Sequence, residues 1–275
     1  MPELPEVQTV VNDLIRADLV GSKINAAKVY WARTVAGHSP HRFNRLIQGK
    51  TIQGIRRRAK FIVFDLDNGW HLLIHLRMTG RIELVPTGRN RRKHEHVILS
   101  LDHQREMRFF DPRKFGRLYL VEDTGNLLGR LGPEPLAPHF TARQLSQRLL
   151  SKKRQLKPLL LDQTFLAGLG NIYVDEALWD AGIHPLRISS TLSSTETRRL
   201  HRSIRKVLRR GLNNLGTTLG KGQTTFYSVA RKRGNNRDAL MVFRRDGLPC
   251  PRCKSTIERL MVGQRSTHIC TKCQI

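Results

Sequence analysis

The chain has 275 residues and a formal net charge of +27, because it contains 49 Lys and Arg but only 22 Asp and Glu. An apolar fraction of 39% argues against a disordered chain, and no apolar run is long enough to span a membrane. The positive excess favours nucleic acid as partner, since neutralised phosphates release counterions, with an anionic membrane surface as the alternative. Without a signal-peptide core near Met1, a cytoplasmic location is expected.

The first segment predicts an amphipathic helix over residues 6–19, which Gly21 ends. Its apolar face is formed by Val7, Val10, Val11, Leu14 and Ile15. Strands are predicted over 60–66 and 71–76, on either side of an Asn68-Gly69 turn that is typical of a β-hairpin. The stretches 96–101 and 107–121 predict further strands. Residues 1–131 are therefore expected to form a mostly β domain led by one helix, a β-sandwich.

Three prolines in residues 132–138 predict a hinge, after which the pattern becomes helical. Helices are predicted over 141–150, 163–181 and 196–215, the last preceded by a capping box of Ser193 and Glu196. The other face of that last helix carries arginines that suit either phosphate or solvent: Arg198, Arg199, Arg202, Arg205, Arg209 and Arg210. A flexible basic loop is expected over 216–240. The second domain is assigned to 139–240.

All four cysteines lie in the last segment, 241–275, as two C-x2-C pairs separated by 16 residues: Cys250, Cys253, Cys270 and Cys273. This spacing is typical of a tetrahedral zinc site with four thiolates and no open position, so the zinc is expected to be structural. A redox dithiol would need only one pair. Between the pairs, residues 254–269 predict a β-hairpin with cations near its tip, a suitable shape for entering a DNA groove.

The N-terminus offers a second candidate site. Removal of Met1 would leave Pro2 with a free secondary amine, whose pKa of about 8 keeps a useful fraction neutral and nucleophilic. Such an amine can attack the anomeric carbon of a sugar, displace a base and leave an iminium ion. Glu3 stands beside it, where a carboxylate could act as general acid or base. Alone, a Met-Pro-Glu start is weak evidence, because many chains begin this way.

Taken together, these motifs closely resemble the formamidopyrimidine-DNA glycosylase family over nearly the whole chain. The matching segments, in chain order, are 1–7 (MPELPEV), 58–61 (RAKF), 111–116 (DPRKFG), 131–136 (LGPEPL), 168–173 (GLGNIY), 264–267 (QRST) and the four-cysteine finger. The resemblance implies an α+β multidomain fold: an N-terminal β-sandwich with a leading helix, then a helix–two-turn–helix domain and a zinc-finger β-hairpin. DNA would lie between the domains.

The resemblance also implies the catalytic group Pro2, Glu3, Lys60 and Arg265. Pro2 would form a Schiff base, and Glu3 would assist opening of the sugar and elimination. Lys60 would grip phosphates that flank the lesion, and Arg265 would bind phosphate on both sides of the target nucleotide.

Further residues are expected to bind DNA: Glu6, which would orient the N-terminal helix, His94, Arg113, Lys157 near the flipped nucleotide, and Asn171 at a helix N-terminus. Met78, Arg113 and Phe115 resemble the family's wedge, which would hold open the gap left by an everted nucleotide. Without the flanking matches, core packing would be the default for Met78 and Phe115. His75, His96 and His103 are interpreted as strand or loop residues.

The implied activity is excision of oxidised purines, such as 8-oxoguanine or formamidopyrimidine, with strand cleavage by β,δ-elimination. The expected partner is double-stranded DNA with damaged bases or abasic sites, bound by a monomer that carries one structural Zn²⁺. The alternatives are an endonuclease VIII-like enzyme for oxidised pyrimidines, against which Leu4 argues, a non-catalytic binder of damaged DNA, and more distantly a zinc-ribbon RNA-binding protein.

Three places depart from the family pattern: Arg77 and Arg244 stand where glycine is usual, and the loop at 220–226 lacks the expected acidic-aromatic continuation. They put lesion preference in doubt more than reaction type.

Overall fold

The computed structural model describes residues 1–220, 222 and 225–275. The chain forms two compact units. Unit 1 comprises Met1–Gly129 and Asn214–Asn235, and unit 2 comprises Arg130–Asn213 and Asn236–Ile275. The predicted division kept 139–240 together, whereas here Asn214–Asn235 groups with the β-rich unit. The reason is a non-local contact that no local pattern reveals: Val229 is buried in the hydrophobic core of unit 1.

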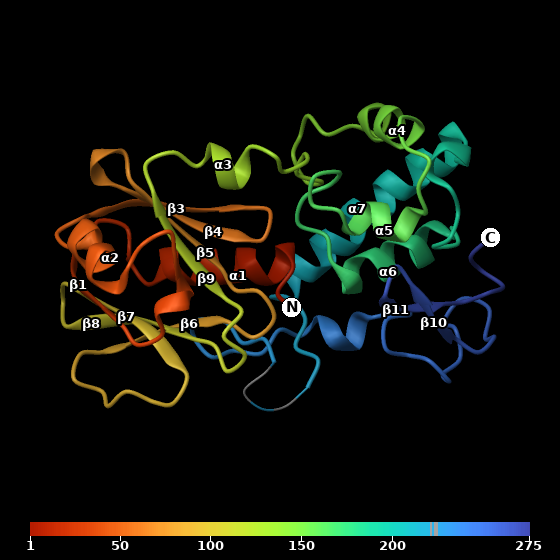
Figure 1. The fold of residues 1–275 in the computed structure, drawn as a ribbon. Helices are drawn as coiled ribbons and strands as arrows, with labels where there is room; N and C mark the ends of the chain where they lie inside the picture. Colours follow the sequence, from red (N-terminus) through yellow and green to blue (C-terminus); the bar gives the residue numbers. More distant parts are fainter. Residues whose placement is uncertain (221, 223–224) are drawn as a thin grey trace. The chain divides into compact units, whose positions relative to one another are not determined.

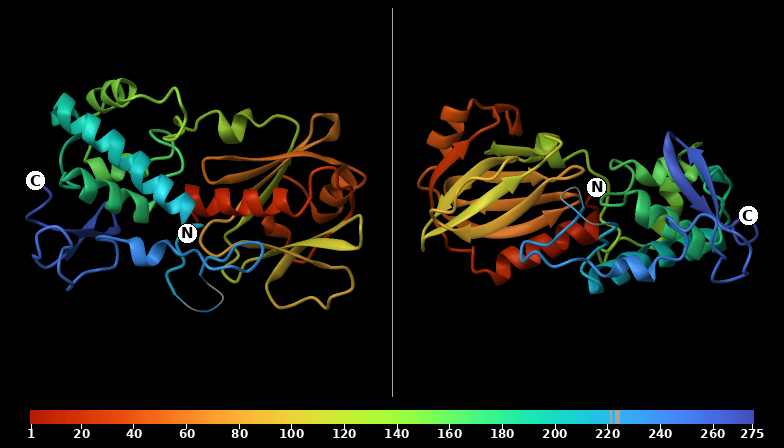
Figure 2. Two further views of the ribbon diagram at one scale, coloured as in Figure 1. Left: turned by 180° about the vertical axis from the view of Figure 1, so that it is seen from behind. Right: turned by 90° about the horizontal axis from the view of Figure 1, so that it is seen from below.

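Unit 1 is the predicted β-sandwich with a leading helix (Figures 1 and 2). One sheet has the strand order β2-β9-β5-β4-β3 and the other the order β1-β7-β8-β6, and every pair is antiparallel except β2–β9. The strands are β1 (Ile24–Val29), β2 (Val35–Ala36), β3 (Ile52–Arg58), β4 (Phe61–Leu66), β5 (His71–His75), β6 (Arg81–Pro86), β7 (Glu95–Leu101), β8 (Arg105–Phe110) and β9 (Arg117–Val121). The helices are α1 (Leu4–Arg16), α2 (Pro40–Ile47) and α3 (Gly125–Leu128), with short 3-10 turns at η1 (Ala32–Thr34) and η2 (Asp67–Gly69).

The leading helix and the first hairpin follow from the sequence pattern. Four of the five predicted apolar residues of α1 are in the core, whereas Ile15 is 44% exposed. The β4–β5 connection has positive φ at both Asn68 (56°) and Gly69 (73°), as the predicted Asn-Gly turn requires.

The stretch 107–121 contains the ends of two strands, separated by a turn at 111–116. The Asp111 carboxylate holds this turn, accepting hydrogen bonds from Gly116 N (2.7 Å) and Arg113 N (3.2 Å). A Cβ at residue 116 would lie 2.3 Å from the Phe109 ring, so glycine is needed there. The turn therefore connects the two sheets and leaves Arg113, Lys114 and Phe115 exposed.

Unit 2 combines helices with a small two-stranded sheet (Figure 1). Its elements are α4 (Ala142–Leu150), α5 (Leu156–Leu161), α6 (Asn171–Ala181), η3 (Ser189–Thr191), α7 (Ser194–Asn213), η4 (Asn236–Ala239), β10 (Glu258–Val262) and β11 (Arg265–Ile269). The capping box before α7 is confirmed: Glu196 N donates to Ser193 Oγ (3.2 Å), and Ser193 N donates to the Glu196 carboxylate (2.8 Å). None of the helices in the described residues is long and apolar enough to cross a membrane.

The predicted helix over 163–181 is shorter in the structure, because α6 begins only at Asn171. The side chain of Gln163 donates to Leu161 O and Leu169 O, both at 2.9 Å, and accepts from Gly168 N at 2.9 Å. These bonds stabilise a compact turn whose apolar composition resembles that of a helix. The turn sets the starting point, and hence the direction, of α6.

Candidate active site

The first six residues place two carboxylates beside Pro2. Pro2 is buried, and Glu3 and Glu6 are 2% and 1% exposed, whereas Met1 is half exposed. Glu6 Oε2 accepts a hydrogen bond of 2.8 Å from Glu3 N. Loss of Met1 would therefore create a secondary amine at a buried position, next to the side chain that the sequence predicts as general acid or base.

The second carboxylate oxygen of Glu6 holds the segment Asn214–Asn235. Thr217 N donates to Glu6 Oε1 at 2.7 Å. The preceding residue, Gly216, has φ of +82°, and a Cβ there would lie 2.9 Å from Glu6 Cγ. Glu6 thus holds both the start of α1 and the distant segment Asn214–Asn235, which fits the predicted role of orienting the N-terminal helix.

Lys60 lies in the two-residue turn between β3 and β4 and is 5% exposed. Ala59, before it, has φ of 51°. Arg57 stabilises the turn, donating from Nη1 to Ala59 O and from Nε to Gln8 Oε1, both at 3.0 Å. Because Gln8 belongs to α1, these bonds tie the lysine's turn to the helix that carries the N-terminal carboxylates.

His75 shares the surroundings of Lys60, which the sequence analysis did not anticipate. Burial and the positive charges of Arg77 and Lys60 together lower the pKa of His75 to about 3. Its Nδ1 accepts a hydrogen bond of 3.0 Å from Arg77 N, so the ring proton is on Nε2. The result is a neutral imidazole beside the lysine. In the sequence the available signal was a histidine that ends a buried apolar strand.

The predicted wedge residues are at the surface rather than in the core. Met78 is 41% and Phe115 47% exposed, and the exposed Arg113 places its guanidinium 5.0 Å from the Phe115 ring centre. A hydrogen bond from Thr79 Oγ1 to the Asp111 carboxylate joins the loop of Met78 to the turn of Phe115. Core packing, the alternative for Met78 and Phe115, therefore does not account for them.

His94 lies against the same turn. It has φ of 72°, and its carbonyl accepts a hydrogen bond of 2.9 Å from Asp111 N. Its ring meets Phe110 edge-on at 5.9 Å. The predicted DNA contact of His94 stays a prediction, and its position next to the wedge turn is compatible with it.

In unit 2, three predicted residues gather around Ser266 at the start of the finger's second strand. Ser266 O accepts hydrogen bonds from Asn171 Nδ2 (2.8 Å) and Lys157 Nζ (2.9 Å). Arg265, the preceding residue, is exposed. The N-terminal end of α6 and the tip of the finger are thus joined through one carbonyl.

Lys157 is enclosed within unit 2. Its side chain is fully buried, and Nζ pairs with Asp175 Oδ1 at 2.6 Å. The other oxygen of Asp175 accepts a hydrogen bond of 3.0 Å from His268 N. This ion pair links α5, α6 and β11, and the predicted DNA contact of Lys157 stays a prediction.

The four cysteines form a compact cluster. Their sulfur atoms all lie within 4.8 Å of one another, with Cys250–Cys273 at 3.9 Å and Cys253–Cys270 at 3.4 Å. Zn–S bonds of about 2.3 Å in a tetrahedron place sulfurs about 3.8 Å apart, which these distances approach. Four thiolates leave no position for water or substrate, so the donor set fits one structural zinc ion.

Comparison with known proteins finds matches to the N-terminal, middle and C-terminal parts of the chain. Residues 1–118 match the formamidopyrimidine-DNA glycosylase N-terminal domain, residues 131–222 the H2TH domain of that enzyme, and residues 247–275 the zinc finger found in FPG and IleRS. Formamidopyrimidine-DNA glycosylases of Protochlamydia amoebophila and Herpetosiphon aurantiacus are 45% and 46% identical to the chain. The alignments cover all of this chain and 99% and 100% of those proteins. The chain belongs to the formamidopyrimidine-DNA glycosylase family.

Solved structures of the family agree with the fold. A Lactococcus lactis Fpg variant in complex with DNA containing Fapy-dG is 34% identical and has a TM-score of 0.91, with 99% of each chain covered. The Thermus thermophilus MutM (Fpg) protein is 38% identical and has a TM-score of 0.89, covering 99% of this chain and 98% of that one.

Two departures from the formamidopyrimidine-DNA glycosylase pattern have a backbone explanation. Arg77 and Arg244 have φ of 53° and 56°, in the left-handed region that glycine adopts without strain. This chain thus keeps, with arginine at both positions, the left-handed backbone conformation for which glycine is usual. The third departure, at 220–226, falls partly outside the described residues, at 221 and 223–224.

A second feature that the sequence analysis missed is the adjacent acidic pair of α6. Glu176 accepts hydrogen bonds from Met241, Val242 and Phe243 N at 2.9–3.0 Å and pairs with Arg210 Nη2 at 2.7 Å. With Asp175, it connects α6 to the finger. Two adjacent carboxylates within a mostly apolar helix were the signal. The ion pair of Arg210 also shows that the arginine face of α7 is partly internal.

Proposed function

We propose that this chain is a bifunctional DNA glycosylase and lyase of base excision repair, which excises oxidised purines such as 8-oxoguanine and formamidopyrimidines. The observation that carries the proposal is a buried Pro2 flanked by the buried carboxylates of Glu3 and Glu6, in a chain related over its full length to formamidopyrimidine-DNA glycosylases. One similar structure, of the Lactococcus lactis Fpg, contains DNA with an abasic site.

In the proposed reaction, the lone pair of the Pro2 nitrogen attacks C1′ of the damaged nucleotide. The C1′–N bond breaks, and its electrons leave with the base, which takes up the proton that the Pro2 nitrogen loses. Glu3 donates a proton to the sugar ring oxygen as the ring opens, which gives an iminium ion between Pro2 and C1′. Loss of a C2′ proton then expels the 3′ phosphate, and a second elimination expels the 5′ phosphate.

Two cationic side chains and one amide would position the DNA for these steps. Lys60, Asn171 and Arg265 are proposed to bind phosphates, while Met78, Arg113 and Phe115 fill the gap left by the everted nucleotide. The bound zinc holds the finger in its fold and takes no part in the reaction. The enzyme is proposed to act as a monomer in the cytoplasm, where the bacterial chromosome lies.

The test is borohydride trapping on duplexes that carry 8-oxoguanine, an oxidised pyrimidine or an abasic site. The proposal predicts a covalent protein–DNA adduct on the first and third duplexes. A matched protein with its N-terminus extended beyond Met1 should bind the abasic-site duplex but form no adduct. Trapping on the oxidised pyrimidine in preference to 8-oxoguanine would instead favour the endonuclease VIII-like alternative, and binding without any adduct would favour a non-catalytic protein.

A further inference from the structure

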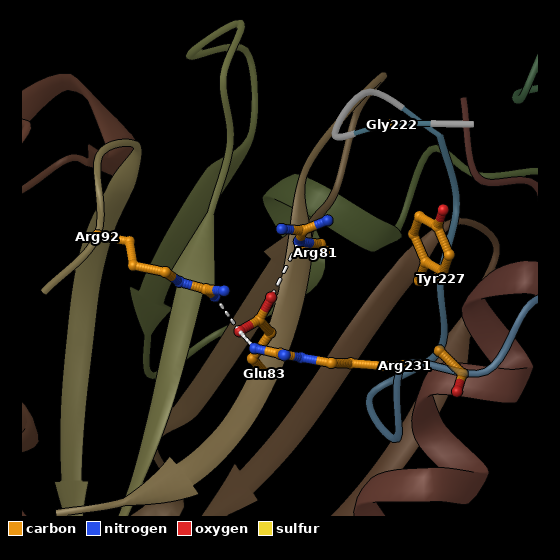
Figure 3. A pocket seen from close by; sticks show the side chains of 7 residues that line it. Arg81, Glu83, Arg92, Gly222, Tyr227 and Arg231 are labelled. Atoms are coloured by element: carbon orange, nitrogen blue, oxygen red, sulfur yellow. Dashed lines mark hydrogen bonds and ion pairs between the residues drawn. The ribbon is translucent and has the colours of Figure 1, made fainter. Parts of the chain in front are cut away.

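A pocket of about 260 Å³ lies in unit 1 between strand β6 and the returning segment after residue 225 (Figure 3). None of the predicted catalytic or wedge residues lines it. Its lining residues are Arg81, Glu83, Arg92, Gly222, Tyr227, Ser228 and Arg231. Three arginines therefore converge on one small cavity that the proposed reaction does not use.

Glu83, at the base of the pocket, is 4% exposed and is surrounded by arginines (Figure 3). Arg231 Nη2 lies 3.0 Å from its carboxylate, and Arg92 also forms an ion pair with it. One carboxylate neutralises one of the three lining arginines, which leaves an excess of two positive charges.

The surrounding ion pairs do not remove this excess. Arg108 and Arg89 join the cluster, and they face the further carboxylates Glu95 and Glu106. The cluster as a whole thus has five arginines and three glutamates, again an excess of two positive charges. The neighbouring carboxylates of Glu95 and Glu106 already form ion pairs with Arg89 and Arg108.

Arg81 shows the effect of this crowding. Burial lowers the pKa of Arg81, and the positive charges of Arg92 and Arg231 lower it further, against the effect of Glu83. Its Nε is buried and makes no hydrogen bond, although it lies 3.2 Å from Glu83 Oε1. A bound anion would relieve the repulsion among the three guanidinium groups.

The uncharged lining groups can also donate to an anion. Ser228 Oγ accepts a hydrogen bond of 3.2 Å from Lys232 N, so its own O–H can donate. Tyr227 presents a phenol at the same cavity. The volume is below the roughly 300–1,000 Å³ of sites for drug-sized ligands, so a small anionic group suits it better than a large one.

We propose that this pocket binds a phosphate group through Arg81, Arg92 and Arg231. Guanidinium groups match phosphate oxygens in planar, paired hydrogen bonds, and the exposed fractions of the Arg92 and Arg231 side chains, 40% and 59%, keep them accessible from solvent. The phosphate belongs either to a small phosphorylated compound or to a DNA backbone. The proposal is independent of the excision chemistry.

The first arm of the test uses inorganic phosphate as probe. Thermal unfolding of the full chain is followed as phosphate replaces chloride at constant ionic strength. The unfolding temperature should rise, because a ligand of the folded state stabilises it. At least half of the rise should be lost in Arg231→Met and in Arg92→Met. It should be kept in Arg42→Met, a control that removes an exposed arginine from α2.

The second arm measures binding to an undamaged duplex over a range of salt concentrations. If a DNA phosphate occupies the pocket, Arg231→Met should reduce the slope of log K against log [salt] by about 0.9, and Arg42→Met should not. Arg231→Lys keeps the charge and should restore the slope.

An effect in the first arm alone identifies a small phosphorylated ligand, and an effect in the second identifies DNA. Arg231→Met that behaves as wild type in both arms would overturn the proposal. So would a salt slope in the second arm that is reduced equally in Arg231→Met and Arg231→Lys, since lysine keeps the charge and the loss would then indicate a disturbed loop.

Discussion

Left-handed backbone conformations accompany the predicted site residues of unit 1. Among the non-glycine residues of unit 1 with positive φ, four stand at or directly before such a site residue, with φ of 51°, 53°, 72° and 59°: Ala59, Arg77, His94 and Lys114. Ala59 precedes Lys60, Arg77 precedes Met78, and Lys114 precedes Phe115. Such conformations cost about 1 kcal/mol or more each for residues with a Cβ, and they recur where a side chain must be aimed. Here they direct cationic and apolar side chains out of tight turns.

Gly216 should be sensitive to any side chain, for two separable reasons. Its φ of +82° strains alanine, and a Cβ would crowd Glu6 Cγ at 2.9 Å. We expect Gly216→Ala to lower the free energy of unfolding in urea by at least about 2 kcal/mol, combining strain with overpacking. Gly88→Ala is the control, because Gly88 has φ of +88° with nothing within 4 Å, and it should show strain alone. Equal effects of the two substitutions would argue against the Glu6 contact.

His75 should make stability depend on pH. The pKa of His75 is lowered to about 3 in the folded protein from 6.5, so the unfolded chain binds more protons between these values. Its contribution is full above about pH 6.5 and is lost as pH falls towards 3. In His75→Gln, the unfolding free energy should fall less steeply than in wild type between pH 7 and pH 5. Parallel curves would show that folding does not lower the pKa of His75.

At the scale of elements, local patterns predicted α1, α4, α7 and the β4–β5 hairpin because each has its own periodicity or turn signal. The strands β1, β2, β3 and β6 were missed, and in β3 three consecutive arginines, Arg56 to Arg58, interrupt the apolar pattern. The start of α6 was misplaced because the side-chain bonds of Gln163 stabilise a turn that the apolar pattern does not distinguish from a helix.

The same limit applies to the site. The motifs predicted Pro2, Glu3 and Lys60 as site residues and located the four-cysteine cluster, whereas the neutral His75 and the burial of Lys157 depend on tertiary contacts. In a chain this rich in basic residues, the sequence pattern does not distinguish a buried lysine from an exposed one.

The link among α5, α6 and β11 should depend on both charges of its ion pair. Lys157→Met leaves Asp175 buried without its ammonium partner and should destabilise the protein by about 3–5 kcal/mol. The double variant Lys157→Met/Asp175→Asn should recover part of that loss, because it removes the uncompensated charge while keeping an acceptor for His268 N. Urea unfolding measures both. Additive effects in the double variant would contradict the pairing.

At the scale of the molecule, the two units divide the proposed work. Unit 1 carries the N-terminal amine, its carboxylates and the wedge, whereas unit 2 carries the zinc finger and the cluster around Ser266. The segment Asn214–Asn235 leaves unit 2 after α7 and packs in unit 1, where Thr217 meets Glu6 and Val229 enters the core. Glu6 therefore connects the chemistry at the N-terminus to a segment more than 200 residues away.

The most direct test of the central claim is to identify the atom that attacks the sugar. The protein is trapped with borohydride on an abasic-site duplex, digested, and analysed by mass spectrometry of the sugar-bearing peptide. The account predicts a peptide that begins at Pro2, with the sugar remnant on its nitrogen and Met1 absent. An adduct on a lysine such as Lys60, or on a chain that still carries Met1, would contradict it.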